Sequence, residues 1–217
     1  MKLSQITIDI PEIQELDINP LVALPSGLIG LDARMTLCHP EKRPGRAGSS
    51  RLAIAPYPQE WEQTLELKDG HEIFIRPVRP EDEDLFKTFF EQVTPEDLRL
   101  RFFAPVRDFS HRFLSRLTQL DYARAIAFAA IEPKDSSLLG VVRLHADPDH
   151  QTGEYAIMVR SDLKGQGLGW TLMKLLIRYA REDGIEVIKG EVLKENTSMI
   201  SMCQSLGFSV GTSPDDP

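Results

Sequence analysis

The segment that most restricts the fold is residues 153–193, where a strand, a glycine-rich turn, a helix and a second strand follow one another. The run "GEYAIMVR" (153–160) alternates as a strand does, and an apolar stripe then recurs at helical spacing from residue 168 to residue 182. The next strand is expected at "EVIKGEVL" (186–193). Two strands joined through a helix lie parallel in one sheet, so the chain must contain a parallel pair here.

The other elements predict that this pair belongs to a mostly antiparallel sheet. Successive strand-like runs separated by short turns are typical of a meander. The expected order is β-α-α-β-β-β-α-β-α-β, with strands at 71–79, 123–132, 137–148, 153–160, 186–193 and 208–210, and helices at 80–93, 110–120, 168–182 and 196–206. The predicted fold class is therefore α+β, a mixed sheet flanked by helices.

Residues 38–60 separate this region from a short N-terminal segment. Prolines, glycines, serines and a basic cluster occur there without apolar periodicity, which is typical of a linker, with a docking patch as the alternative. In residues 1–37, two apolar runs flank "PSG" and predict a hairpin. So short a segment cannot bury a core of its own, so we expect a remnant at 1–37 and the functional domain at 61–217.

Composition excludes several classes of function. A net charge of −8 argues against general nucleic-acid binding, which needs a basic surface. Cys38 and Cys203 lie far apart without CxxC spacing, so neither a disulfide framework nor a metal site is predicted. There is no apolar run of the ~18–20 residues that a membrane span needs, and no secretory segment at the start. We expect a cytoplasmic protein without nucleic-acid or membrane partners.

The glycine turn favours a phosphate ligand. Gly165, Gly167 and Gly169 precede a helix whose free N-terminal amides can bind an anion. A dinucleotide fingerprint would need a third glycine where Trp170 stands, and the Lys-Ser/Thr pair of a P-loop is absent. Two explanations of the glycine turn remain: it binds another phosphate ligand, or it is a tight turn without a ligand.

The stretch "LKGQGLG" resembles the [QR]-x-x-G-x-[GA] motif of the GNAT-superfamily N-acetyltransferases, with Lys164 at the Gln/Arg position and Gly167 and Gly169 at the glycine positions. The stretch "EVLKENTSMISMCQSLGF" resembles the second acetyl-CoA motif of that family, in which Asn196 opens a helix. The likeness covers about residues 65–210. It implies the GNAT fold, in which the parallel pair splays apart to admit acetyl-CoA as cosubstrate.

A narrower resemblance is to the acetyltransferase domain of bacterial protein lysine acetyltransferases, carried by "RPVRPEDEDLFKTFFEQVTPEDLRLRFF" and "GEYAIMVRSDLKGQGLG". Those proteins also contain a region similar to NDP-forming acyl-CoA synthetases, and residues 1–37 resemble the last hairpin of its ATP-grasp unit. The resemblance implies a lysine on an AMP-forming acyl-CoA synthetase as acceptor, and a missing synthetase-like domain. It also implies a further strand after "LGFSV", so we expect an unpaired sheet edge.

Acetyl transfer to lysine requires a base, because an amine of pKa ~10.4 is almost entirely protonated at neutral pH. Strand alternation puts Glu154, Ala156 and Met158 on one face of an apolar strand. We expect Glu154 to be partly buried, to have a raised pKa and to act as the general base; a merely solvating charge is the alternative. The resemblance places the catalytic glutamate of the family at this position.

The remaining site predictions concern acetyl-CoA. Backbone amides near Met158 and Val159 are expected to meet the oxyanion. The amides expected at the pyrophosphate are those of Gln166, Gly167, Leu168 and Gly169. Asn196 is expected either to bind the pantetheine or only to cap its helix. The last helix has no tyrosine to act as general acid, so the thiolate is expected to take its proton from water.

Two other functions stay open on the sequence alone. One is acetylation of a small amine, and the other is a non-catalytic module that senses acyl-CoA. The residues alone do not choose between them and protein lysine acetylation.

Overall fold

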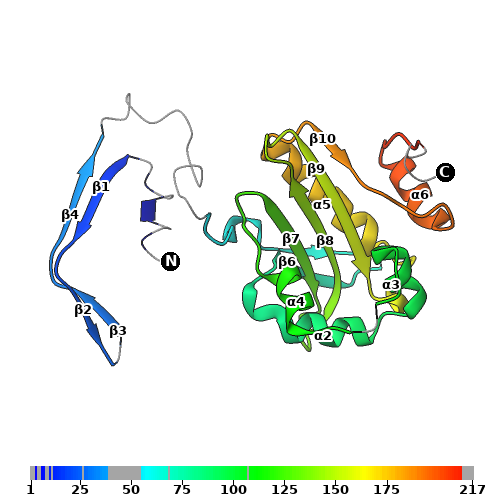
Figure 1. Ribbon diagram of the computed structural model, residues 1–217, viewed down its shortest axis with the longest axis horizontal. Helices are drawn as coiled ribbons and strands as arrows, with labels where there is room; N and C mark the ends of the chain where they lie inside the picture. The colour runs from blue at the N-terminus through cyan, green and yellow to red at the C-terminus, as the bar shows by residue number, and fades with distance from the viewer. Residues whose placement is uncertain are drawn as a thin grey trace. The chain divides into compact units, whose positions relative to one another are not determined.

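The structure is a computed structural model of the 217-residue chain. It describes residues 3, 6, 7, 10, 12–25, 27–38, 55–67, 69–106 and 108–211. Two compact units divide the chain, residues 1–56 and residues 57–217 (Figure 1). Most of the predicted linker, residues 39–54, lies outside the described residues.

The first unit is a two-stranded ribbon in two antiparallel sections. Strand β1 (Ile13–Ile18) pairs with β4 (Ala33–Leu37), and β2 (Leu21–Leu24) pairs with β3 (Gly27–Gly30). The predicted hairpin is therefore confirmed. Many of its large apolar side chains are exposed, Leu28 by 69% among them, so the ribbon buries little apolar surface of its own.

The second unit contains a six-stranded sheet in the order β10-β9-β8-β7-β6-β5. The strands are β5 (Gln63–Glu66), β6 (Glu72–Pro77), β7 (Ala125–Ile131), β8 (Leu138–Ala146), β9 (Thr152–Val159) and β10 (Val187–Lys189). Every neighbouring pair is antiparallel except β9 and β10, which are parallel. The predicted α+β class and the parallel pair are confirmed.

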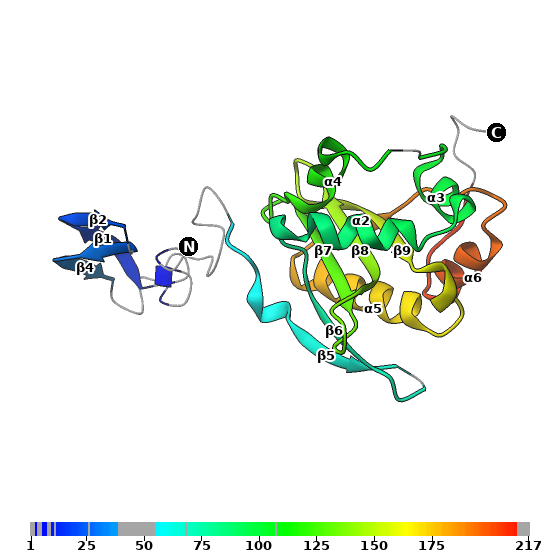
Figure 2. The same cartoon turned by 90° about the horizontal axis from the view of Figure 1, so that it is seen from below.

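Helices cover both faces of this sheet (Figure 2). The helices are α2 (Glu83–Glu91), α3 (Pro95–Phe102), α4 (His111–Thr118), α5 (Leu168–Glu182) and α6 (Thr197–Ser205), with 3-10 turns η3 (Gln59–Trp61), η4 (Pro80–Asp82) and η5 (Ser161–Leu163). Helices α2 and α4 lie on one face and α5 on the other. The predicted apolar stripe of α5 is buried: Leu168, Leu172, Leu175, Leu176, Tyr179 and Ala180. On the opposite face, Phe86, Phe89 and Phe90 of α2 are buried.

Four local elements differ from the sequence prediction. Strand β5 and helix α3 form where no element was predicted, because β5 has only four residues and only Leu98 of α3 is buried. The strand predicted at 186–193 is limited to 187–189, and the strand predicted at 208–210 is wrong. Instead of joining a ladder, the amide of Phe208 bonds back to the carbonyl of Cys203 (3.0 Å) and closes the end of α6.

The last residues of the predicted linker pack on the second unit. The hydroxyl of Tyr57 donates to Glu62 (2.6 Å), and its ring meets that of Tyr122 edge-on. Trp61 packs against Phe128, with ring centroids 5.7 Å apart. Residues 57–60 are therefore part of the folded domain rather than linker.

Candidate active site

Strand β9 is paired over different lengths on its two sides. Its ladder with β8 runs from Gly153 to Val159. Its ladder with β10 ends at the pair Glu154 and Lys189, and the chain then leaves β9. Within the described residues, no strand pairs with the β10 side of residues 155–159, which we call the open edge of β9. The predicted splaying of the parallel pair is thus present.

Two hydrogen bonds establish which amides point to the open edge. Arg160 N–H donates to Leu139 (2.9 Å) and Asp147 N–H to Thr152 (2.8 Å), so the even-numbered residues of β9 direct their backbone groups toward β8. The N–H groups of Ile157 and Val159 therefore face the open edge. Met158, predicted beside Val159, directs its N–H to β8 and contributes its buried side chain instead.

Gly190, the residue after β10, lies directly over the ring of Tyr155 where the chain leaves β9. A Cβ atom on this residue would lie 2.4 Å from Cε1 of Tyr155, so only glycine fits over that ring. The Tyr155 hydroxyl lies 3.0 Å from the buried sulfur of Cys203, and its ring packs against Phe208. Burial, together with the Cys203 contact, raises the pKa of Tyr155. This side chain joins β9 to α6 beside the point where the strands part.

The glycine turn presents free amides at the start of α5. Gly165 (φ 79°) and Gly167 (φ 92°) adopt the left-handed conformation that favours glycine. The first intrahelical bond runs from Thr171 N–H to the carbonyl of Gly167 (3.0 Å), so the amides of Leu168 and Gly169 precede it. The first turn of α5 has no acidic residue. Its dipole and free N–H groups suit an anion.

Polar contacts attach the glycine turn to α3. Lys164 pairs with Asp97 of α3, so its side chain points away from the free amides. Ser161 donates to the same carboxylate (2.5 Å) and accepts from Thr94 N–H (2.9 Å). Burial would raise the pKa of Asp97, but the hydrogen bonds with Lys164, Ser161 and Thr94 outweigh it, and the pKa is lowered. The side chain of Lys164, predicted to belong to the acetyl-CoA site, therefore attaches the glycine turn to α3 in this structure. The side chain of Gln166, another predicted site residue, donates to the Asp162 carbonyl (3.3 Å).

Asn196 caps helix α6. Its side-chain oxygen accepts a hydrogen bond from Met199 N–H (3.3 Å) and another from the Ser198 hydroxyl (3.3 Å). Capping, one of its two predicted roles, is thus observed. Its contact with a ligand stays a prediction.

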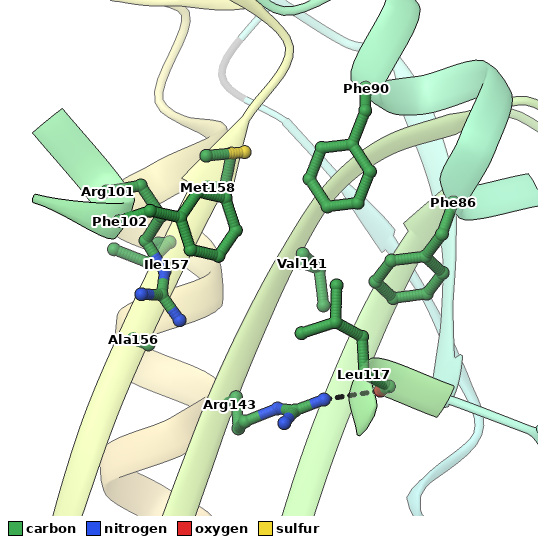
Figure 3. A pocket seen from close by; sticks show the side chains of 10 residues that line it. All are labelled: Phe86, Phe90, Arg101, Phe102, Leu117, Val141, Arg143, Ala156, Ile157 and Met158. Atoms are coloured by element: carbon green, nitrogen blue, oxygen red, sulfur yellow. Dashed lines mark hydrogen bonds between the residues drawn. The ribbon is translucent and has the colours of Figure 1, made fainter. Parts of the chain in front are cut away.

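The face of β9 that carries Glu154, Ala156 and Met158 adjoins a pocket of about 330 Å³, open space at the mouth included (Figure 3). The lining residues are Phe86, Phe90, Arg101, Phe102, Leu117, Val141, Arg143, Ala156, Ile157 and Met158. Glu154 is exposed, so the predicted partial burial is wrong. Helix α2 covers the Met158 end of the strand, whereas Glu154 lies opposite His145, which is exposed as well.

Two arginines line this pocket, and the sequence analysis missed both. Arg143 of β8 donates to the carbonyls of Arg116 (3.1 Å) and Leu117 at the end of α4, and burial, followed by the nearby Arg101, lowers its pKa to about 10. Burial also lowers the pKa of Arg101, against the opposing attraction of Glu154. An arginine within the apolar run "VVRLHA" was the available signal for Arg143.

Three features of this site are typical of an N-acetyltransferase. The parallel strands β9 and β10 separate, α5 begins with free amides, and the carboxylate of Glu154 lies where the two strands separate. The model of the acetyltransferase (GNAT) family matches residues 83–208, and the chain belongs to this family. The model of an ATP-grasp domain matches residues 1–37.

Known proteins extend this comparison. An acetyltransferase of Pseudomonas aeruginosa is 31% identical over 172 residues, which cover 78% of this chain and 91% of the relative. The crystal structure of the GNAT domain of S. lividans PAT is 29% identical with a TM-score of 0.69, over 74% of this chain and 95% of that domain. An L-methionine sulfoximine/L-methionine sulfone acetyltransferase of Pseudomonas aeruginosa is 36% identical over 59 residues, only 27% of this chain and 34% of the relative.

Two other kinds of feature are absent from the described residues. No group of three or more His, Cys, Asp or Glu side chains is placed to hold a metal ion. In the same part of the chain, no helix has the length and apolarity to cross a membrane.

Proposed function

We propose that this protein is a lysine N-acetyltransferase that transfers acetyl from acetyl-CoA to a lysine side chain of a protein, acting in the cytoplasm. The observation that carries the proposal is the double role of β9. One strand presents Glu154 on the pocket face and the N–H groups of Ile157 and Val159 on the open edge. Similarity to the S. lividans PAT domain supports a protein acceptor.

The open edge and the glycine turn fit acetyl-CoA. The pantetheine arm, which contains amides, would pair with Ile157 and Val159 as an added strand. Asn196, at the start of α6, is the side chain that we propose binds the same arm. Pyrophosphate would accept hydrogen bonds from the amides of residues 166–169. The left-handed Gly167 leaves the backbone bare at this point, and no atom of the described residues lies within 4 Å of where its Cβ would be.

The chemistry then requires one attack and the loss of two protons from the lysine nitrogen. The Glu154 carboxylate takes the first proton from the lysine ammonium through intervening water, and the amine attacks the thioester carbonyl carbon. The oxyanion accepts a hydrogen bond from an N–H group of the open edge. When the tetrahedral intermediate collapses, the C–S bond breaks, the nitrogen gives its second proton to water, and the thiolate of coenzyme A takes a proton from water. Glu154 then returns its proton to solvent. Glu154 is exposed in the free protein, so its desolvation would come from the bound substrates.

Substitution of Glu154 tests this proposal. Glu154→Gln should reduce acetyl transfer by roughly 10²–10⁴-fold, while the Kd for acetyl-CoA changes less than about twofold because the cosubstrate contacts are backbone groups. Transfer is measured by mass spectrometry with labelled acetyl-CoA and a panel of AMP-forming acyl-CoA synthetases, and binding by calorimetry. Glu66→Gln, an exposed carboxylate on β5, is the matched control. Unchanged turnover in Glu154→Gln would exclude Glu154 as the base.

The acceptor partner we propose is an AMP-forming acyl-CoA synthetase. We also propose that residues 1–37 are the end of an ATP-grasp unit, which the match to the ATP-grasp family model supports.

A second candidate function is acetylation of a small amine, favoured by the 59-residue match to an amino-acid acetyltransferase. Competition of free amino acids or polyamines with the protein acceptor would favour this candidate. Acetyl-CoA binding without transfer to any acceptor would indicate a sensing module.

A further inference from the structure

We propose that Arg101 binds a carboxylate of the acceptor close to the reacting amine and thereby selects which amines are acetylated. The proposal deepens the proposed function and rests on it only in taking the acceptor to be an amine. The chemical class it defines is an amine with a neighbouring carboxylate, such as a lysine beside an acidic residue or a free amino acid.

The guanidinium of Arg101 has no anionic partner within the part of the chain that the structure describes. It extends from the last turn of α3 toward the pocket floor, between β9 and Arg143 (Figure 3). Among the described residues it makes no hydrogen bond and no ion pair, and it lies over the ring of Phe102, whose centroid is 5.0 Å from Cζ. Guanidinium groups in partly buried positions are ordinarily paired, so this one is available to a ligand.

Charges around the pocket are unbalanced. Arg101 and Arg143 are the cations that line it, and Glu154 is the carboxylate on the same face of β9. Arg143 donates to the carbonyls of Arg116 and Leu117, so both of its terminal nitrogens already have acceptors. Arg101 remains free to form a bidentate pair with a carboxylate, the strongest arrangement for this side chain.

The surroundings strengthen such a pair. The other walls are mostly apolar, with Phe86, Phe90 and Val141 among them. Burial already lowers the pKa of both arginines, and each unpaired charge is therefore costly in this pocket. An entering carboxylate would compensate that cost.

The position of Arg101 is suited to selection rather than to proton transfer. It lines the pocket with Ala156, the next residue after Glu154 on this face of β9. Two residues along a strand span roughly 7 Å. The attraction between Arg101 and Glu154 indicates that the two groups are close enough for one acceptor to contact both.

The test compares two lysine peptides that differ only in a glutamate or a glutamine beside the lysine. Wild-type protein should acetylate the glutamate peptide with about tenfold higher kcat/KM, mainly through KM, since a charged pair of this kind contributes about one decade. Arg101→Gln should abolish the preference, and Arg101→Lys should restore part of it. Arg112→Gln removes one exposed positive charge on α4 and should keep the preference.

Other results would overturn the proposal. One is no preference in the wild type; another is the same preference in Arg101→Gln. An equal loss for both peptides would show that Arg101 acts only through Glu154. A weaker Kd for acetyl-CoA would show that it binds the cosubstrate.

A separate measurement distinguishes failure of the proposed function. If wild-type protein acetylates neither peptide, protein lysine acetylation fails, and binding of the two acetyl-lysine product peptides is measured by calorimetry with coenzyme A present. Tighter binding of the glutamate product that Arg101→Gln removes supports the carboxylate site, and equal binding overturns it. Free lysine and lysine amide form a further pair: preference for free lysine that is lost in Arg101→Gln identifies an α-carboxylate as the group bound.

Discussion

The two sides of β9 serve the proposed reaction with different parts of the chain. The open edge and the glycine turn consist of backbone amides, whose positions depend on where the strands part and where α5 begins. The pocket face consists of side chains from α3, β8 and β9, namely Arg101, Arg143 and Glu154. The comparison indicates that the cosubstrate side tolerates many side-chain changes but few changes of glycine, whereas the acceptor side depends on individual charges.

The largest effect is expected at Gly190, where the chain that leaves β10 lies directly on the Tyr155 ring. Gly190→Ala would place a methyl group 2.4 Å from the Tyr155 ring, and such overpacking costs about 1–3 kcal/mol. Since Tyr155 belongs to the open edge of β9, displacing this contact should weaken acetyl-CoA binding as well. Urea unfolding and calorimetry measure the two effects.

The control for this prediction is Gly211→Ala. Neither glycine has a positive φ, and among the described residues no atom lies within 4 Å of the added methyl group at Gly211. Equal stability of the two variants would contradict the steric conflict at Gly190.

An intermediate effect is expected in the glycine turn, where Gly167 and Gly169 should respond differently to alanine. The motif of the acetyltransferase family accepts either glycine or alanine at the position of Gly169. A methyl group on Gly169 makes only ordinary contacts, 3.7 Å from Val159 and 3.8 Å from Met202, and alanine in a helix is favoured by up to about 1 kcal/mol. Gly169→Ala should therefore melt at the same or a higher temperature and bind acetyl-CoA within about twofold of wild type.

Gly167→Ala provides the contrast, because its left-handed backbone costs alanine about 1–2 kcal/mol of stability. Thermal unfolding and calorimetry separate the two variants. A clearly weaker Kd for acetyl-CoA in Gly169→Ala would contradict this difference between the two glycines.

The cosubstrate side was predictable from sequence because its signals are local. Gly165, Gly167 and Gly169 mark the turn, and the apolar stripe of α5 follows directly. Parallel pairing of the two strands follows from their connection through a helix, so the fold class and the family were both accessible.

The acceptor side was predictable only in part. Glu154 could be assigned to a face by alternation, but its exposure depends on where α2 ends over the sheet. Arg101 belongs to a helix whose alternating leucines and arginines give no amphipathic stripe, and only tertiary packing brings it to Arg143. Long-range contacts of this kind leave no periodic trace in a sequence.

The smallest effect is expected at Asp97, which joins the two sides by attaching α3 to Lys164 and Ser161 of the glycine turn. Its lowered pKa means that the folded state favours the carboxylate, so this stabilisation is complete above the unfolded pKa of about 3.9 and is lost as the pH falls through the folded value. Asp97→Asn should reduce the free energy of unfolding by about 1 kcal/mol at pH 7, since Lys164 is half exposed.

The difference between Asp97→Asn and wild type should shrink below about pH 4, where the wild-type carboxylate takes up its proton. Urea unfolding at pH 7, 5 and 3.5 measures it, with Glu91→Gln as an exposed control. A difference that stayed constant across this range would assign the contribution of Asp97 to packing rather than charge. Because α3 also carries Arg101, loosening this attachment should lower acetyl-CoA affinity and the preference for acidic acceptors together, each by less than the corresponding glycine or arginine variant does.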